Sequence, residues 1–277
     1  MQKLNTSEIF LTAKNAIAED IGTGDLTAAL LDQNKLLKAF IISREDAVLC
    51  GIPWVNAAIE ILDEKANIVW GADDGENIKE GQVICEISGN AGAILSGERT
   101  FINFLQTLSG TATTTAEYVS LIDKSSAIIL DTRKTIPGLR TAQKYAVRCG
   151  GGQNHRKGLF DGILIKENHI SAAGSITVAV QKMKESWPSV PIEVEVENLK
   201  ELEEAIKANA DIVLLDNFSI ELVKKAIKLN KKNVKIEISG NITKDTIKEL
   251  AKLEVDYISI GALTKHVHAI DFSMQLK

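Results

Sequence analysis

The sequence predicts an α/β protein in two parts, an N-terminal α/β sandwich-like domain followed by an incomplete parallel α/β barrel. The main observation is a series of short apolar runs in the second half of the chain, most of them separated by amphipathic helical segments. The last four runs begin 19, 23 and 23 residues apart, which is the length of one strand plus one helix. Strands that are apolar on both faces and alternate with helices are typical of parallel sheets and α/β barrels.

The first part of the chain is predicted to mix helices and strands. A helix is expected from Ser7 to Glu19, because its apolar residues recur at helical spacing. Apolar residues at the same spacing predict a helix over Glu98 to Leu108, with Ser109-Gly110 as its stop or break. We place the domain boundary here, with residues 1–110 in the first domain and 111–265 in the barrel. Strand-like runs of the first domain lie at 39–43, 68–70 and 83–87.

The second domain is predicted to contain six strands, each followed by polar residues or glycines. Single polar residues such as Asn198, Asn217 and Thr243 are also explained as caps of the next helix. Six polar strand ends in register instead predict a site, because the carboxyl ends of barrel strands converge on one mouth. The six apolar runs are 127–130, 162–165, 192–196, 211–215, 234–238 and 257–260.

Basic residues gather between positions 131 and 169, a segment that contains eight lysines and arginines but only three acidic residues. The whole chain nevertheless has a formal net charge of −5. A basic island on an acidic protein suits a small polyanion, whereas a negative exterior repels nucleic acid. The alternative is a solvated helix face, and Arg140, Lys144 and Arg148 fit it because they recur every four residues.

The cationic strand ends suit a ligand with more than one anionic group. Arg133 and Arg156 carry planar guanidinium groups that match carboxylates and phosphates. Lys134 and Lys166 are compact point charges. Together with Thr132, these residues line the predicted mouth on one side.

The remaining strand ends offer small residues and carboxylates. Ser239-Gly240 and Gly261-Ala262 each lead towards a helix, and backbone amides at helix starts bind phosphate. Glu195 and Asp216 are candidates for binding ribose hydroxyls, for coordinating Mg2+ or for stabilising a cationic sugar carbon. Pairing with the basic residues across the mouth is an equally acceptable interpretation of both carboxylates.

Several classes of protein are disfavoured. No stretch approaches 18 apolar residues, and the first ten residues lack the features of a signal peptide. We therefore expect a cytoplasmic protein without a membrane partner. The cysteines, at 50, 85 and 149, lack the spacing of a disulfide framework or a zinc knuckle.

Longer motifs resemble the quinolinate phosphoribosyltransferase family from near residue 19 to near residue 264. The motifs are EDIGTGDLT at 19–27, SGERTFINFLQTLSGTAT at 96–113, DTRKTIPGLR at 131–140, KYAVRCGGGQNHRKGLFDGILIKENHI at 144–170, EVEVENLKE at 193–201, LLDNF at 214–218 and ISIGALT at 258–264. The resemblance implies transfer of phosphoribosyl from phosphoribosyl pyrophosphate to quinolinate, with release of pyrophosphate and CO2. The product, nicotinate mononucleotide, feeds NAD synthesis.

The resemblance also implies roles for individual residues. It makes the protein a homodimer, or a higher oligomer built from dimers, in which Arg99 acts in the partner's site, and it places the chain end, about 266–277, on the first domain. Quinolinate is gripped by Arg133, His155, Arg156 and Lys166. Phosphoribosyl pyrophosphate and Mg2+ meet Lys134, Glu195 and Asp216, and the backbone around Ser239, Gly240, Asn241, Ile260, Gly261 and Ala262 holds the 5′-phosphate. Lys134, Lys166, Glu195 and Asp216 are the implied catalytic residues.

Two departures from the family's pattern are Asn241, where a second glycine is usual, and Ile136, where a threonine is usual. Three alternative functions remain open. One is a relative of the same fold, associated with molybdenum transport genes, that uses another substrate. The second is a lyase or aldolase with Lys166 as a Schiff-base nucleophile, and the third is a non-catalytic anion sensor.

Overall fold

The computed structural model describes residues 4–32, 34–231 and 233–277, which divide into two compact units. Unit 1 comprises Met1–Ala116, Thr135–Gly151 and Leu263–Lys277, and unit 2 comprises Glu117–Lys134 and Gly152–Ala262. Residues 135–151 lie within the range predicted for the barrel, yet they pack with unit 1.

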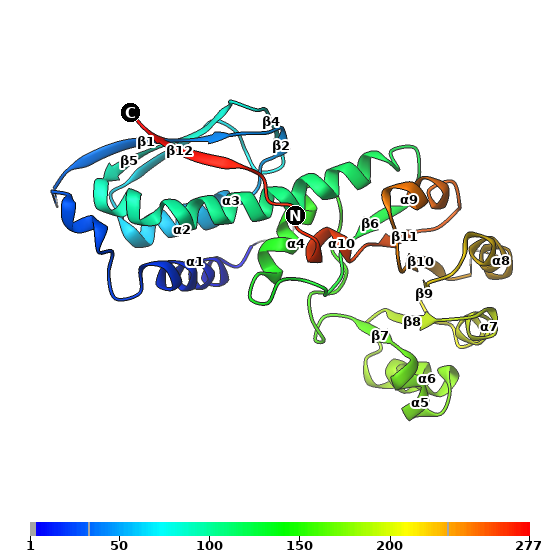
Figure 1. Ribbon diagram of the computed structural model, residues 1–277. Coiled ribbons are helices and arrows are strands. Elements are labelled where there is room, and N and C mark those ends of the chain that lie inside the picture. Colours follow the sequence, from blue (N-terminus) through cyan, green and yellow to red (C-terminus); the bar gives the residue numbers. More distant parts are fainter. Residues whose placement is uncertain (1–3, 33, 232) are drawn as a thin grey trace. The chain divides into compact units, whose positions relative to one another are not determined.

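Unit 1 is built on a four-stranded antiparallel sheet with the order β12-β1-β5-β3. The predicted strands at 39–43, 68–70 and 83–87 are confirmed, and the C-terminal strand β12 pairs along β1 (Figure 1). The strands are β1 Leu36–Ser43, β3 Asn67–Trp70, β5 Val83–Asn90 and β12 Phe272–Leu276, with the short pair β2 Ala47–Val48 and β4 Asn77–Ile78 beside them. The helices are α1 Thr6–Ile21, the 3-10 helix η1 Thr27–Leu30, α2 Ile52–Leu62, α3 Ala91–Ser120 and α4 Arg140–Cys149.

Helix α3 runs through the break that the sequence predicted at Ser109-Gly110, so that prediction is wrong. Both residues are used by tertiary contacts instead. The Ser109 hydroxyl accepts the Cys50 amide at 2.9 Å and donates to the Cys50 carbonyl at 3.2 Å. Gly110 lies so close to the His268 carbonyl oxygen that an added Cβ would collide with it. Gly110 is therefore a packing glycine, and it does not end the helix.

Gly110→Ala is expected to lower the free energy of unfolding by ~1–3 kcal/mol, because a backbone carbonyl must shift to admit the methyl group. Urea denaturation measures this change. The matched control is Gly92→Ala in the same helix, where the added Cβ meets only the Asn90 Oδ1, at 3.2 Å. The control should be neutral or stabilising, since alanine is the better helix former. Equal losses in both variants would contradict the packing explanation.

Unit 2 is an α/β unit around a six-stranded parallel sheet with the order β6-β11-β10-β9-β8-β7. All six predicted strands are present, and within the described residues the sheet is open at β6 and β7, consistent with an incomplete barrel. The strands are β6 Ile128–Leu130, β7 Ile163–Ile165, β8 Ile192–Val196, β9 Ile212–Asp216, β10 Lys235–Ser239 and β11 Tyr257–Ser259.

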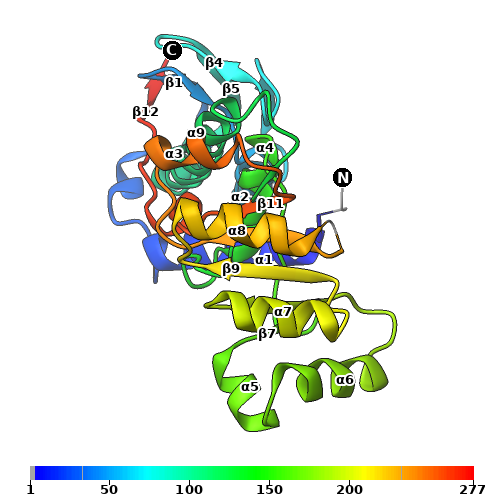
Figure 2. The ribbon, with the colours of Figure 1, turned by 90° about the vertical axis from the view of Figure 1, so that its right-hand side faces the viewer.

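Helices follow the strands of unit 2 and lie along one side of the sheet (Figure 1). Figure 2 shows α7 and α8 side by side over neighbouring strands. The helices are α5 Glu167–Ala173, α6 Ile176–Ser186, α7 Leu199–Lys207, α8 Ile220–Asn230 and α9 Lys244–Leu250, while α10 Ala262–Lys265 starts at the last residue of unit 2 and continues into unit 1. In the described part of the chain, no helix combines the length and the apolar character that crossing a bilayer requires.

Candidate active site

The parallel register brings the carboxyl ends of four strands to one level. Ser239 pairs with Asp216 on one side and with Ser259 on the other, and Ser259 pairs with Leu130. The bonds continue past the strand ends, because the Ile260 amide donates to the Leu130 carbonyl at 2.9 Å. The polar residues that follow these strands therefore lie along one edge of the sheet in unit 2.

Lys166 and Glu195 form an ion pair between the ends of β7 and β8, with the Lys166 Nζ donating to the Glu195 Oε2. The Glu195 side chain is 13% exposed and that of Lys166 is 40% exposed. A lysine and a glutamate that hold each other at a strand end can both orient a ligand of mixed charge. Pairing across the mouth, which the sequence left open for Glu195, is thus observed.

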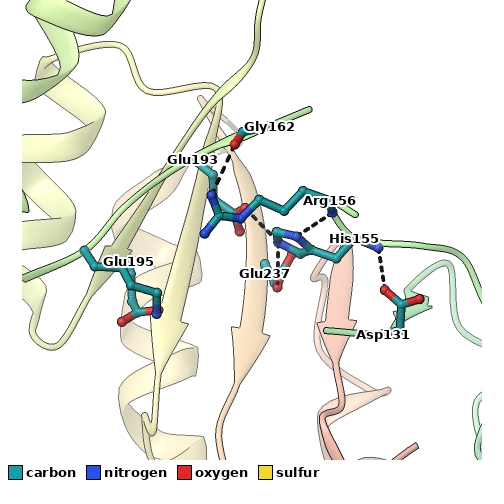
Figure 3. A network of polar contacts seen from close by, with 8 residues as sticks. Asp131, His155, Arg156, Gly162, Glu193, Glu195 and Glu237 are labelled. Atoms are coloured by element: carbon teal, nitrogen blue, oxygen red, sulfur yellow. Dashed lines mark hydrogen bonds and ion pairs between the residues drawn. The ribbon is translucent and has the colours of Figure 1, made fainter. Parts of the chain in front are cut away.

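The glycine-rich loop 150–158 places His155 and Arg156 near the same strand ends. An isolated parallel bridge joins Gln153 to Leu130 and fixes the loop beside β6. The buried Asp131 carboxylate then accepts the His155 amide at 2.9 Å and the Asn154 side-chain amide at 2.6 Å. Two residues further along, Arg156 extends its guanidinium to the Gly162 carbonyl at 3.2 Å (Figure 3).

Arg156 lies in an environment that favours an anionic ligand. Partial burial lowers the pKa of its guanidinium, and the positive charge of Arg133 lowers it further, while Glu193 and Asp161 oppose the shift. Two guanidinium groups that repel each other in a half-buried site gain stability when an anion lies between them. The arrangement suits a carboxylate or phosphate ligand.

The last strand ends have the backbone conformation expected of a phosphate loop. Gly240 and Asn241 follow β10 with φ angles of 99° and 50°, so the departure at Asn241 keeps a left-handed backbone, which asparagine tolerates. A Cβ at Gly240 would collide with the Asn217 side chain. Asn217 in turn donates to the Asp216 Oδ2 at 2.9 Å. Only a glycine lets these two ends approach so closely.

Lys134, Thr132 and Gly261 also lie together. A Cβ added to Gly261 would stand 2.9 Å from the Lys134 Cδ and 3.4 Å from the Thr132 hydroxyl. The structure therefore gathers the predicted site residues of unit 2 at one edge of the sheet. Of the predicted helix caps, Asn198 and Thr243 cap α7 and α9, whereas Ser219 takes the cap of α8 in place of Asn217.

Some of the basic residues that the sequence analysis named belong to unit 1. Arg99 is exposed on α3, and Arg140, Lys144 and Arg148 lie on α4. The alternative that these α4 residues form a solvated face is wrong for Lys144, which is 4% exposed. Its burial depends on the packing of α4 within unit 1, which helical periodicity does not specify.

Two carboxylates near the site were missed by sequence reasoning. Glu193 and Glu237 are buried at 5% and 1% exposure in the middle of β8 and β10. Both converge on the His155 ring (Figure 3). The available signal was a glutamate flanked by β-branched residues within a strand predicted to be buried on both faces, since such a position rarely holds an acid unless the acid has partners.

A second group of potential metal ligands lies in unit 1, where Cys50, Asp74 and Cys149 each place one ligand atom within 4.8 Å of the others. The Asp74 carboxylate already accepts the amides of Gly51 and Ile52 at 2.9 and 3.2 Å and the Tyr145 hydroxyl at 2.8 Å. Burial raises the pKa of Asp74 to about 6. The cluster supports the start of α2, with its carboxylate occupied by these donors.

The Asp74→Asn variant is expected to lose part of the pH dependence of stability. A folded-state pKa of about 6, above the ordinary aspartate value of 3.8, gives stability that is full below the lower value and is lost as pH rises through the higher one. Asp74→Asn should therefore gain roughly 3 kcal/mol relative to wild type between about pH 3 and pH 8. Thermal unfolding across that range measures it, with the exposed neighbour Asp73→Asn as the control. A constant difference across the range would contradict the expectation.

The comparisons with known proteins agree over almost the whole chain. The model of the quinolinate phosphoribosyl transferase N-terminal domain matches residues 25–109, and that of the C-terminal domain matches residues 111–275. The chain therefore belongs to the quinolinate phosphoribosyl transferase family.

Individual relatives give the same result. The chain is 44% identical over 259 residues to a probable nicotinate-nucleotide pyrophosphorylase (carboxylating) of Bacillus subtilis, covering 93% of this chain and 90% of the relative. A relative described in the same words from Methanocaldococcus jannaschii is 40% identical, covering 95% of each chain. The structure of the nicotinate-nucleotide pyrophosphorylase from Francisella tularensis matches with a TM-score of 0.96 and 49% identity, covering 99% of this chain and 98% of the other.

Proposed function

We propose that the strand ends of the parallel sheet carry out quinolinate phosphoribosyl transfer, the reaction for which the family is named. The nitrogen of quinolinate attacks C1 of the ribose as pyrophosphate leaves, and the 2-carboxylate is then lost as CO2. The observation that supports this proposal most directly is the shared sheet edge, where cations for a dicarboxylate lie beside an acidic residue and a glycine-containing phosphate loop.

The dicarboxylate is held by Arg133, Arg156 and Lys166. The repulsion between Arg133 and Arg156 supports their role, because a dianion relieves it. Lys166 is already oriented by Glu195, so its ammonium donors need little ordering when the ligand arrives. After CO2 leaves, the electron pair remains on the ring carbon beside the cationic nitrogen, where these cations stabilise it until a proton from solvent completes the product.

Phosphoribosyl pyrophosphate is held by the other strand ends. The amides around Gly240 and Gly261 receive the 5′-phosphate, and Lys134 beside Gly261 neutralises charge on the leaving pyrophosphate. Glu195 stabilises the positive charge that develops on C1. Asp216 is half-buried and offers carboxylate oxygens that suit Mg2+, whereas Glu195 is engaged by Lys166. When bound, Mg2+ would neutralise the pyrophosphate.

We also propose a homodimer in which Arg99 completes the partner's site. Its exposure on α3 leaves the guanidinium accessible to a second chain. Residue Arg99 belongs to unit 1 and the proposed ligands belong to unit 2, which is compatible with action across an interface. A cytoplasmic location stays a prediction.

The deciding experiment incubates the protein with quinolinate, phosphoribosyl pyrophosphate and Mg2+ and follows pyrophosphate and labelled CO2. Equal release of both from quinolinate, and of neither from nicotinate, is expected. Pyrophosphate release without CO2, with another base, would assign a different substrate to the same fold.

The alternative of a Schiff-base lyase is disfavoured by the ion pair at Lys166. An amine nucleophile needs a free lone pair on its nitrogen, whereas the Lys166 Nζ is held by the Glu195 carboxylate as the donor of an ion pair. Borohydride in the presence of candidate carbonyl substrates should therefore leave Lys166 unmodified. A covalent adduct at Lys166 would favour the lyase.

A further inference from the structure

The buried cluster of His155, Glu193 and Glu237 lies one layer below the proposed site. Glu193 precedes Glu195 by two residues on β8, and Glu237 precedes Ser239 by two residues on β10. Alternate residues of a strand share a face, so each buried acid is on the same face as a residue of the site. Figure 3 shows the two carboxylates and the imidazole pointing toward one another.

The hydrogen bonds of His155 identify its protonation state. The Arg156 amide donates to the His155 Nδ1 at 2.8 Å, so Nδ1 presents a lone pair. The ring proton is then on Nε2, which lies 2.8 Å from the Glu193 Oε2 and 3.7 Å from the Glu237 Oε1. His155 is therefore neutral, and it donates into the acidic pair.

This tautomer decides what occupies the cluster. One atom each of His155, Glu193 and Glu237 lies within 4.8 Å of the others, which resembles a metal-ligand set. A metal would need a lone pair on Nε2, but Nε2 carries the proton. The occupant that the geometry favours is a further proton shared within the acidic pair.

The acids themselves need that proton. In the described part of the chain, the Oε1 atoms of Glu193 and Glu237 have no hydrogen-bond partner. Two buried charges of the same sign are costly unless one of them is neutralised. The pKa of Glu237 is raised to about 8, first by burial and then by the charge of Glu193, while His155 and the Ser259 hydroxyl oppose the shift.

The charged and polar groups around Glu237 come from three elements. Glu193 faces it from β8, His155 from the loop before β7, and Ser259 from β11. Arg156 interacts with Glu193 from the same loop as His155. Glu237 is thus the acid that holds the proton at neutral pH, and the Nε2–H of His155 is directed at the Glu193 Oε2.

We propose that Glu237 is a positioning residue, which as a neutral carboxylic acid adds no second negative charge beside Glu193 and so leaves Arg156 in place for a carboxylate of the substrate. Both ring nitrogens of His155 are engaged within the chain, so in this proposal His155 acts through the Arg156 amide and does not itself grip quinolinate as the family resemblance implied. The role of Glu237 in catalysis rests on the proposed function, whereas the protonation pattern of the His155 cluster is independent of it.

Loss of the Glu237 proton should disturb this arrangement in a defined way. Once Glu237 has lost its proton, a second negative charge lies beside Glu193 and attracts the Arg156 guanidinium towards the acidic pair and away from the carboxylate of the substrate. The KM of the wild type for quinolinate is then expected to rise about tenfold per pH unit above the pKa of Glu237, the behaviour of a single titrating proton. The KM for phosphoribosyl pyrophosphate should not follow this rise.

Glu237→Gln provides the kinetic test, because the amide is a neutral analogue of the carboxylic acid. The variant is expected to keep a KM for quinolinate within about threefold of wild type at pH 7 and to lack the alkaline rise. Glu203→Gln, which alters an exposed carboxylate on α7, is the control and should keep the rise. An unchanged rise in Glu237→Gln, or an equal rise in both KM values, would overturn the proposal.

A second measurement is independent of activity and of any variant. The imidazole 15N shifts of labelled wild-type protein distinguish the Nε2–H form, the Nδ1–H form and the imidazolium. The Nε2–H form of His155 is expected at neutral pH, and it should persist as Glu237 ionises, because raising the pH only removes protons from the cluster. An Nδ1–H form or an imidazolium at pH 7 would overturn the protonation pattern even if quinolinate proved not to be the substrate.

Discussion

Replacing Glu195 by glutamine is expected to lower kcat by 10²- to 10³-fold, on the order of the loss when one preorganised electrostatic group is removed. The neutral amide cannot stabilise positive charge on the ribose carbon, and it leaves the Lys166 ammonium without its present counter-charge. Steady-state kinetics with both substrates, supported by a thermal unfolding curve, measures the effect. Lys166→Met should cause a comparable loss in kcat/KM together with a higher KM for quinolinate.

The pair gives a sharper result than either variant alone. Lys166 and Glu195 orient each other. The double variant Lys166→Met/Glu195→Gln should therefore have a kcat/KM only slightly below that of the less active single variant, as is usual for groups that act as a unit. The matched control is Glu197→Gln, an exposed carboxylate just beyond β8, which should remain within about twofold of wild type. Additive losses in the double variant would show that the two residues act separately.

The strand ends could be predicted from the sequence because each depends on local information. An apolar run of limited length followed by a polar residue identifies both the strand and its carboxyl end. The parallel arrangement then brings Asp216 and Ser239 together regardless of the details of packing. The sequence predicted well those site residues that the parallel topology alone brings together at the strand ends.

The features that the sequence did not predict depend on tertiary partners. Gly110 looks like a helix stop, but its meaning comes from the chain at His268, far away in sequence. The apolar face of α4 does not specify which sheet it covers, and α4 packs within unit 1.

Glu237 escaped notice for a related reason. Ile236 and Ile238 on either side are both buried, so alternation of polar and apolar residues does not reveal which face of β10 lines the site. Only the convergence of His155 and Glu193 on Glu237 gives it a role. Sequence reasoning found the residues proposed to touch the substrates, and the structure added the residues proposed to position them.

Hybrid dimers are expected to recover activity that neither parent has. If Arg99 serves the partner's site, Arg99→Gln should lower kcat/KM on the order of 10²-fold, the loss expected for one charged hydrogen bond of ~3 kcal/mol. Mixing it with Glu195→Gln and exchanging subunits forms hybrids in which one site has its own Glu195 and an intact partner Arg99. Random pairing makes half of the dimers hybrid with one of two sites intact, so about 25% of wild-type activity should return.

The reciprocal experiment removes the remaining ambiguity. A chain carrying both Arg99→Gln and Glu195→Gln is mixed with wild type in equal amounts. If Arg99 acts across the interface, the wild-type subunit of each hybrid lacks a partner arginine, and activity falls to about 25%, because only wild-type homodimers, one quarter of the total, stay active. If Arg99 acts within its own chain, every wild-type subunit stays active and about 50% remains. Activity near 50% here, together with no recovery in the first mixture, would show that Arg99 acts in its own chain and that the dimer is not required for a complete site.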